Sequence, residues 1–417
     1  MQKHHHAALT RRQLLAAGTG LLSSSLVKPQ VPSQKKTVAA IVTMYTDDRS
    51  LKSHASVIVG RMLEGYAPNN VQTEPRTQVV SMYTDQVPAN DLSRGLSEKH
   101  HFKIYPTVGA ALCLGGSKLA VDAVLIVGEH GNYPTNAKGQ KLYPRYELLE
   151  QVVDVFRRDQ RTVPVFSDKH LSYSWWKARR MVEWSRELKF PLMAGSSIPV
   201  TVRVPELEIP YNAEFENALA VGYGDVDAYG FHTLETLQCM VERRAGGEKG
   251  VTSVHMLEVE DVWKWRDSAE GRWSIPLLKA ALATTPKTKP GNPEQNTTKP
   301  VLFLLEYRDG LQAAVYLLNG HTSGFLFAGK LKGKAEPVAT HCGFLEDGRP
   351  LAHFDGLVHC IEEMFITGQP IYPIERTLLT SGVLSFLFDS RYEKKRIQTS
   401  ELKIAYRAPR ETYFQRS

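Results

Sequence analysis

The sequence predicts an α/β protein in two parts: a doubly wound parallel sheet, then a second α/β domain with a large, mostly antiparallel open sheet. In the first part, short apolar runs alternate with amphipathic runs up to about residue 190, which is the pattern of βαβ units. After Pro191 the runs become longer and strand-like. A chain of 417 residues is also too long for one small core.

The first predicted domain, 36–190, follows an N-terminal leader. Its predicted strands are 37–45, 77–85, 103–107, 119–128 and 162–166, and its predicted helices are 53–66, 90–100, 108–114, 145–160 and 172–189. Asn90 and Ser172 are residue types that cap helix N-termini, and we expect them to cap two of these helices. Right-handed crossovers would bring the carboxyl ends of all the strands to one edge, where ligands bind.

The second predicted domain covers 191–417. The runs "VTSVHMLEVEDVWKW" and "VLFLLEYRDGLQAAVYLLNGHTSGFLFAGKLKG" predict long meandering strands. Segment 284–300 is rich in Pro, Thr, Lys and Asn, which predicts an exposed or disordered loop. The last helix, "PIERTLLTSGVLSFLFDSRYE", is expected to pack back toward the first domain. An open sheet is also a surface through which copies of the chain could form a homo-oligomer.

The composition narrows the class of protein. Hydrophobic residues make up 42% and charged residues 23%, which is typical of a globular chain. The net charge of +7 is mild for this length and shows no basic stripe with interleaved aromatics, so we expect no nucleic-acid partner. The four cysteines form no CxxC pair and are predicted to be buried free thiols.

Residues 1–35 have the features of a leader. Arg11 and Arg12 precede a short stretch of leucine, alanine and small residues, which predicts a twin-arginine (Tat) signal peptide. That route carries folded proteins, so we expect the mature protein in the periplasm or outside the cell. No other run is apolar over the roughly 18 residues that a membrane span needs, so we expect none.

Three polar clusters follow predicted strands of the first domain. They are Asp85, the pair Glu129 and His130, and the triplet Asp168, Lys169 and His170. Since the strands are expected to be parallel, all three clusters should meet at one edge of the sheet. The sequence therefore predicts a functional site at that edge, with Lys169 at its centre.

Four local stretches resemble the Gfo/Idh/MocA oxidoreductases. "SDKH" is similar to the family's E-K-P motif, and "VDAVLIVGEHGNYPTN" is similar to its D-A-V-x-I-A-T-P-N strand. "VGYGDVDAYGFHTLETLQCMV" is similar to its G-G-G-x-L-x-D-x-G-x-H-x-x-D segment, and "VVSMYTD" to the strand that ends at the adenosine ribose. The resemblance extends over nearly the whole chain after the leader and implies a Rossmann domain followed by a substrate domain.

What the resemblance implies is hydride transfer between NAD or NADP and a carbon of a sugar or polyol. Lys169 would donate to the substrate oxygen and contact the cofactor, and His232 would be the general acid–base. Asp227 would orient one of them, and His170 would contact the substrate. The cofactor residues would be Asp85 at the ribose, with Glu129 and His130 beside the nicotinamide.

The sequence departs from that family at the first strand. The family's G-x-G-x-x-G loop brings the backbone close to the pyrophosphate. Here "TMYTDDRSLKSHA" contains no glycine and carries Asp47 and Asp48, which would repel a pyrophosphate. The acid before His232 is also displaced, because Asp227 stands five residues away where the family has four.

Two alternatives therefore stay open. In the first, Glu129, His130, His170 and His232 converge on a divalent cation, as a metal-dependent sugar lyase, epimerase or isomerase would require. In the second, the chain is a carbohydrate-binding protein that has lost its cofactor and its activity.

Overall fold

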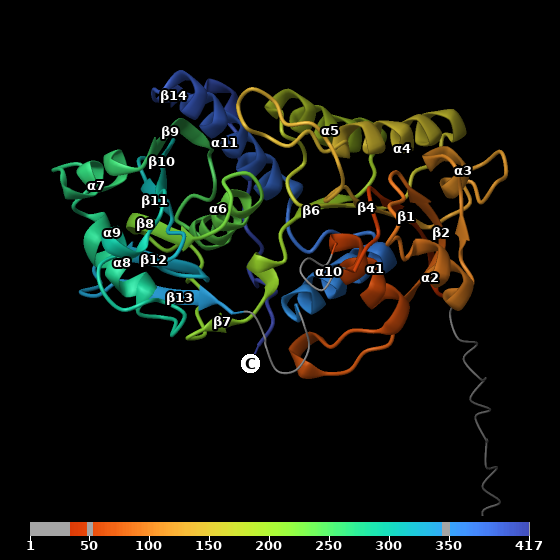
Figure 1. Cartoon of the computed structure of the whole chain (residues 1–417), viewed down its shortest axis with the longest axis horizontal. Helices are drawn as coiled ribbons and strands as arrows, with labels where there is room; N and C mark the ends of the chain where they lie inside the picture. The colour runs from red at the N-terminus through yellow and green to blue at the C-terminus, as the bar shows by residue number, and fades with distance from the viewer. Residues whose placement is uncertain (1–33, 48–52, 344–350, 417) are drawn as a thin grey trace, which may run out of the picture. The chain divides into compact units, whose positions relative to one another are not determined.

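The computed structural model describes residues 34–47, 53–343 and 351–416. The predicted leader lies outside these residues, except for its last two positions, and so do Asp48 and the rest of segment 48–52. Lys35–Ser417 form one compact unit. Two β-sheets with their helices make up this unit (Figure 1).

The first sheet is parallel throughout. Its strands are β1 (Lys36–Val42), β2 (Thr77–Thr84), β3 (Lys103–Ile104), β4 (Ala123–Val127), β5 (Val165–Asp168) and β6 (Leu192–Gly195). Their order is β3-β2-β1-β4-β5-β6, which is the order of a doubly wound nucleotide-binding fold. The carboxyl ends of β1, β4 and β5 are therefore neighbours, as the sequence predicted.

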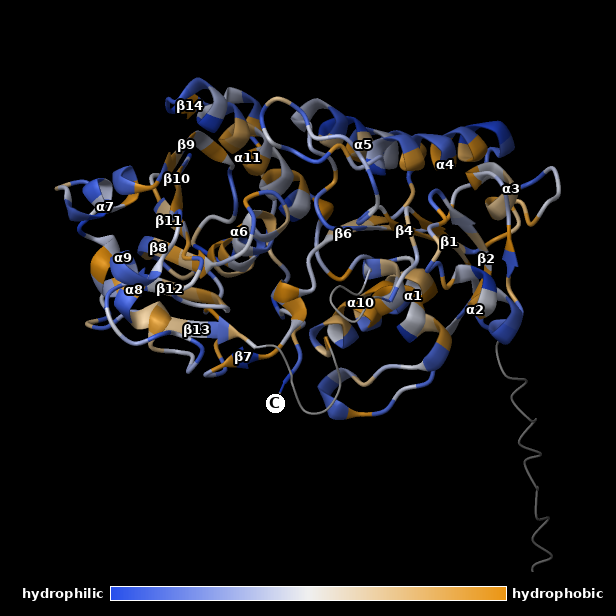
Figure 2. Ribbon diagram, in the orientation of Figure 1, coloured by the Kyte–Doolittle hydropathy of each residue, from blue (hydrophilic) through white to orange (hydrophobic). Residues whose placement is uncertain are grey.

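Helices cover both faces of this sheet. They are α1 (His54–Glu64), α2 (Ser93–His100), α3 (Val108–Leu112), α4 (Arg145–Asp159), α5 (Trp175–Leu188) and, from the end of the chain, α10 (His353–Thr367). Alternate residues of β1 point to opposite faces: Ala39 and Ile41 join a core with α3, α4 and α5, whereas Ala40 and Val42 join a core with α1 and α10. Figure 2 shows the hydrophobic residues along β1 and β4.

The two predicted helix caps are wrong. Helix α2 is preceded by Leu92 as its N-cap rather than by Asn90, and α5 is preceded by Ser174 rather than by Ser172. In the second case, the hydroxyl of Ser172 accepts the amide of Ser174 at 3.3 Å and so closes a turn before the helix begins. Short polar side chains stabilise such turns as readily as they cap helices.

Within the described residues, the second sheet has eight strands. They are β7 (Arg203–Val204), β8 (Phe215–Gly222), β9 (Val251–Glu258), β10 (Val301–Tyr307), β11 (Gln312–Leu317), β12 (Phe325–Leu331), β13 (Val338–Cys342) and β14 (Ile397–Gln398). Their order is β14-β9-β10-β11-β8-β12-β13-β7, and every pair except β11 with β8 is antiparallel. The predicted fold class, a parallel sheet followed by a mostly antiparallel one, is confirmed.

Helices also cover the second sheet. Helices α6 (Ala228–Val241) and α11 (Ile374–Glu393) pack on β8 and β9, and the segment between β9 and β10 forms α7 (Glu260–Asp267), α8 (Ser274–Leu282) and α9 (Pro293–Asn296). Leu277, Leu278 and Ala281 of α8 form a core with Leu302 and Tyr316 of the sheet. The sheet face that we expected to be open is therefore covered by the chain itself at α7 and α8.

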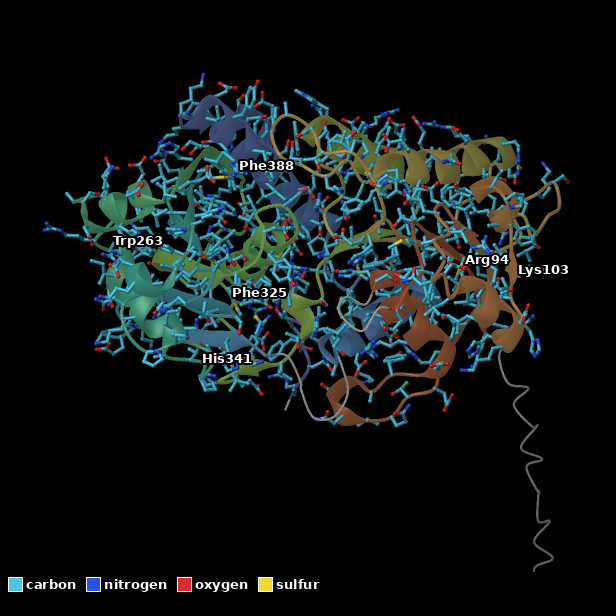
Figure 3. All side chains as sticks on the ribbon, in the orientation of Figure 1. Arg94, Lys103, Trp263, Phe325, His341 and Phe388 are labelled. Carbon is cyan, nitrogen blue, oxygen red and sulfur yellow. The ribbon has the colours of Figure 1, made fainter. Side chains whose placement is uncertain are left out.

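Three further predictions concern helix α11, segment 284–300 and the cysteines. Helix α11 packs on α5 and β6 of the first sheet, as predicted. The segment predicted to be an exposed or disordered loop contains α9. All four cysteines are buried free thiols. Figure 3 shows the side chains of this unit, with Phe388, which is buried, on α11 and Arg94 on α2. In the part of the chain that the structure describes, no helix has the length and apolar character of a membrane span.

Candidate active site

Lys169 follows the end of β5 and contacts His232 of α6. Its backbone has a φ of 68°, a left-handed conformation that costs a lysine about 1–2 kcal/mol. The amide of Lys169 donates to the carbonyl of Gly195 at 3.0 Å, which holds this turn in place. The turn brings Nζ of Lys169 to 2.6 Å from Nε2 of His232. Backbone strain of this kind is concentrated at functional sites in proteins.

The contacts of His232 define its tautomer. An ammonium group only donates, so Nε2 of His232 accepts from Lys169 and the proton is on Nδ1. Nδ1 donates to the hydroxyl of Ser196 at 2.5 Å, and that hydroxyl also accepts the amide of Ile198 at 3.0 Å. Burial and the neighbouring Lys169 hold the pKa of His232 well below its usual range. Sequence reasoning missed Ser196, which reads as a loop residue after β6.

A buried carboxylate lies behind Lys169. Oε1 of Glu129, two residues after β4, is 3.9 Å from Nζ of Lys169, and Oε2 forms an ion pair with Arg145. Burial alone would raise the pKa of Glu129, but Lys169 and Arg145 together hold it well below its usual range. Arg145 was missed as well, because at the start of α4 it reads as an ordinary charged helix residue.

His170 and Asp227 lie next to this group. Nη1 of Arg145 donates to Nε2 of His170 at 3.1 Å, and burial and Arg145 hold the pKa of His170 well below its usual range. Asp227 accepts the amide of Lys141 at 2.8 Å and lies 3.9 Å from His170. Burial raises the pKa of Asp227 to about 6.

Asp227 contacts neither of the residues that it was expected to orient. It is the N-cap residue of α6, with His232 five positions further along the chain. At 3.6 residues per turn, five positions are about 1.4 turns, so the two side chains leave the helix on different faces. The displaced acid of the sequence motif therefore faces the loop after β4 instead of His232.

A second imidazole–carboxylate pair joins β5 to α1. Oδ2 of Asp168 accepts a hydrogen bond from Nδ1 of His54 at 2.6 Å. His54 is the first residue of α1. The amide of His54 donates to Nδ1 of His130 at 3.4 Å. His130 has a φ of 70°, and burial together with His54 lowers its pKa to about 4. Sequence reasoning missed His54, since nothing in α1 marks this residue.

Asp85 lies apart from these residues, at the end of β2. Its two carboxylate oxygens accept the hydroxyls of Tyr83 at 2.8 Å and Tyr133 at 2.6 Å. The site thus brings together Lys169, His232, Glu129, His170 and His130, whereas Asp85 lies at the position expected for a ribose-binding residue but is bonded to protein hydroxyls.

The residues that we considered as metal ligands do not form a donor set. In segments 34–47, 53–343 and 351–416, no three His, Cys, Asp or Glu side chains lie close enough together to hold a metal ion. Two of the four candidates are engaged elsewhere, because His170 accepts from Arg145 and His232 accepts from Lys169.

A fold of this type holds a dinucleotide across the carboxyl end of β1, with the pyrophosphate at the N-terminus of α1. That place is occupied by the protein's own hydrogen bonds in the described residues. The first amides of α1 are already used: that of His54 by His130, and that of Ser56 by the capping hydroxyl of Ser53 at 3.2 Å. The Ser53 hydroxyl also bonds the amide and carbonyl of Thr46, which closes the two ends of the loop onto each other.

A strap of chain crosses the same place. Residues 129–133 run from the end of β4 to the end of β2, the strands on either side of β1. Thr43, just after β1, donates its hydroxyl to the carbonyl of Glu129 at 2.8 Å. Asn132 and Gln86 exchange two hydrogen bonds of 2.8 and 3.2 Å, and Tyr133 donates to Asp85. These residues do not fit a dinucleotide laid across β1.

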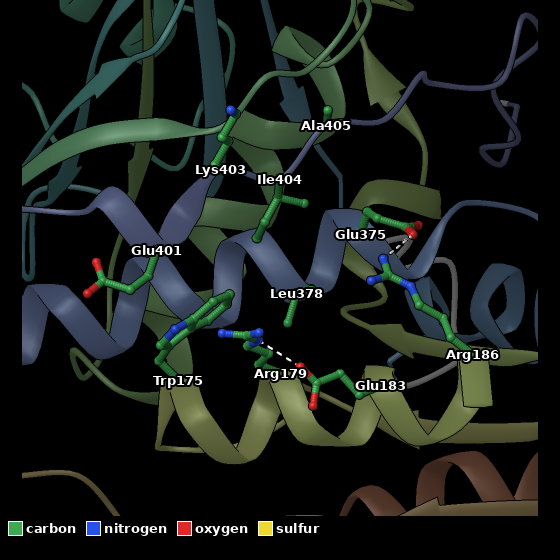
Figure 4. Close-up of a pocket in the computed structure, with 10 residues that line it drawn as sticks. All are labelled: Trp175, Arg179, Glu183, Arg186, Glu375, Leu378, Glu401, Lys403, Ile404 and Ala405. Carbon is green, nitrogen blue, oxygen red and sulfur yellow. Dashed lines mark hydrogen bonds and ion pairs between the residues drawn. The ribbon is translucent and has the colours of Figure 1, made fainter. Parts of the chain in front are cut away.

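A separate cavity of about 480 Å³ lies between α5, α11 and residues 401–405 (Figure 4). Its charged side chains are largely paired with each other, Arg179 with Glu183 and Arg186 with Glu375. It shares no lining residue with the Lys169 site.

Comparison with known proteins supports the fold alone. No protein-family model and no curated protein sequence matches the chain. Among solved structures, it is similar to GenD2 from gentamicin A biosynthesis in complex with NAD (TM-score 0.54, 10% identity, 93% of this chain and 99% of that one). It is also similar to apo scyllo-inositol dehydrogenase from Lactobacillus casei (0.53, 8%, 88% and 99%).

A further similar structure is a putative myo-inositol dehydrogenase from Sinorhizobium meliloti 1021 (TM-score 0.51, 13% identity, 87% of this chain and 99% of that one). The chain therefore has the fold of these structures, a parallel sheet followed by a mostly antiparallel one.

Proposed function

We propose that this chain is an exported enzyme that acts on a sugar or polyol at a carbon bearing a hydroxyl or carbonyl group. The observation that carries the proposal is the 2.6 Å contact between Nζ of Lys169 and Nε2 of His232, at the carboxyl edge of the first sheet. The ammonium has further donors for a substrate oxygen, and the imidazole provides a path for the proton.

The surroundings of Lys169 support this role. Glu129 and Arg145 are buried beside it, and Ser196 holds the neighbouring imidazole in one tautomer. A hydrogen bond from a cation to a developing oxyanion is stronger in such a water-poor site than in solvent. Export by the twin-arginine route is part of the proposal, supported by Arg11 and Arg12.

A second candidate is hydride transfer with NAD or NADP. It is supported by the fold and by the contact between Lys169 and His232, the residues that match the family's lysine and histidine. The strap 129–133 and the occupied amides of α1 count against it. We therefore place the proton-transfer chemistry of Lys169 and His232 first, and assign no step to a nucleotide.

The proposal is tested with purified protein and a panel of aldoses, ketoses, inositols and sugar acids. Product formation is followed by nuclear magnetic resonance, with and without added NAD or NADP. We expect turnover of at least one compound without nucleotide. Lys169→Met should lower its rate by about a hundredfold or more, because it removes the charge that stabilises the oxyanion.

Lys403→Met is the matched control, since Lys403 is exposed and lines the separate cavity; its rate should equal that of the wild type. Turnover that requires a nucleotide would establish the second candidate instead. If no compound is converted under either condition, or if Lys169→Met is fully active, the proposed site is wrong.

A further inference from the structure

We propose that His54, held by Asp168, is a second acid–base group of this site and removes a carbon-bound proton from a hydroxy-carbonyl sugar. The inference rests on the proposed function, in which Lys169 serves the substrate oxygen. It assigns to the site a class of reaction, isomerisation through an enediol, that needs neither a nucleotide nor a metal.

The geometry of the pair sets its chemistry. Asp168 is buried and accepts a hydrogen bond from Nδ1 of His54 at 2.6 Å, so Nδ1 carries a proton and, in the neutral imidazole, Nε2 carries the lone pair. Nε2 has no hydrogen-bond partner among the described residues, and the side chain is 13% exposed. A carboxylate that fixes this tautomer also stabilises the imidazolium that forms when Nε2 takes a proton.

The ring of His54 is held in a fixed orientation. Phe354 of α10 meets it edge to face, with centroids 5.0 Å apart and planes at 85°, and the ring of His130 lies 5.3 Å away. The backbone amide of His54 is bonded to the same His130. A general base needs such a fixed position, because a misplaced base loses most of its effect.

His54 and Lys169 belong to the same site. Asp168, which holds His54, and Lys169 are consecutive residues at the end of β5. The same turn therefore positions both His54 and the Lys169 ammonium. His54 and Lys169 also both lower the pKa of the same four side chains, which are Glu129, His130, His232 and His353. A substrate bound between α1 and α6 would therefore meet a base from α1 and a cation from β5.

The step balances without an external oxidant. Nε2 of His54 takes the proton from the hydroxyl-bearing carbon next to the carbonyl, and the C–H electron pair becomes the C=C bond of an enediol. The carbonyl π-pair moves to its oxygen, which takes a proton from the Lys169 ammonium. The resulting amine then removes the proton of the other hydroxyl, whose O–H electron pair forms the new C=O bond. The C=C pair takes the proton of the imidazolium at the former carbonyl carbon, which restores both side chains. An aldose thus becomes a ketose.

The test follows hydrogen exchange at carbon. D-glucose, D-xylose, D-galacturonate and D-fructose are incubated with the protein in D₂O, and deuterium at the carbons of the carbonyl and its neighbour is measured by nuclear magnetic resonance. We expect the wild type to convert at least one sugar into its aldose or ketose isomer, seen in the same spectra, with deuterium at carbon wherever the imidazolium exchanges its proton with solvent. His54→Ala should lose about a hundredfold or more of this rate and regain part of it with added imidazole.

Asp168→Asn leaves His54 in place and should also slow the exchange, because the amide no longer stabilises the imidazolium. His101→Asn is the control: His101 is exposed and has a φ of 58°, which asparagine tolerates. It should exchange at the wild-type rate.

The outcomes separate this inference from the proposed function. Turnover without interconversion of an aldose and a ketose, or a His54→Ala variant with the wild-type rates of isomerisation and exchange, overturns the role of His54 and leaves that of Lys169 standing. Exchange that persists in Lys169→Met but fails in His54→Ala overturns the role of Lys169 instead. Loss in His54→Ala without imidazole rescue, while Asp168→Asn keeps the full rate, shows a structural role and also overturns the inference.

Discussion

At the scale of single residues, burial changes the ionisation of polar groups in and around the site. Glu235 of α6 is the clearest case. One turn after His232, its Oε1 accepts the hydroxyl of Thr380 at 2.6 Å, while its buried Oε2 has no hydrogen-bond partner among the described residues. Burial raises the pKa of Glu235 to about 7. The folded protein therefore holds this carboxyl protonated at pH values where the unfolded chain has lost the proton.

This shift makes stability depend on pH. Because the folded pKa is raised, the folded state binds more protons between about pH 4.5 and about pH 7, and stability falls as pH rises through that window. Glu235→Gln removes the ionisation. We expect it to raise the free energy of unfolding by about 1–3 kcal/mol at about pH 8 and by much less at about pH 5.

Urea denaturation at the two pH values measures this difference. Glu401→Gln is the matched control, because Glu401 is exposed and its charge is solvated. An equal effect of Glu235→Gln at both pH values would mean that the carboxyl is not the source of the pH dependence.

At the scale of elements, helix α8 covers the outer face of the second sheet. Leu278 is 4% exposed and lies in the core against β10 and β11, whereas Ile275 of the same helix is 44% exposed. We expect Leu278→Ala to lower the free energy of unfolding by about 2–4 kcal/mol, because it leaves a cavity in a packed core. Ile275→Ala should change it by less than about 0.5 kcal/mol.

Chemical denaturation of the two variants and the wild type measures both values. If the two substitutions have the same effect, the helix does not bury its Leu278 face in solution, and the outer face of the sheet is open to another occupant.

At the scale of the whole molecule, we predict that the chain crosses a membrane after folding. Arg11 and Arg12 precede the apolar part of the leader and lie outside the described residues. Replacing both by lysine should keep the protein inside a bacterial host with a twin-arginine export system, because that pathway reads the arginine pair. Cell fractionation measures the result, and unchanged export of the variant would refute the prediction.

Much of the fold could be predicted from the sequence, because local periodicity records it. The alternation of strands and helices predicted the parallel sheet, and the clusters around Glu129 and Lys169 predicted the edge at which polar groups gather. Lys169 was predicted from its place at the end of a strand, and His232 from the resemblance of its segment to a family motif. The structure places the two side chains in contact, and their roles stay predictions. The leader is likewise predicted by local composition alone.

Only the tertiary structure decided which groups meet. His54 and Arg145 come from two different helices and Ser196 from a loop. No local pattern marks them, since a histidine or an arginine at the start of a helix is an ordinary residue. The strap 129–133 over β1 and the cover of the second sheet by α8 depend on contacts between segments far apart in the chain. Local sequence records the conformation of each segment, whereas the site depends on long-range packing and hydrogen bonds.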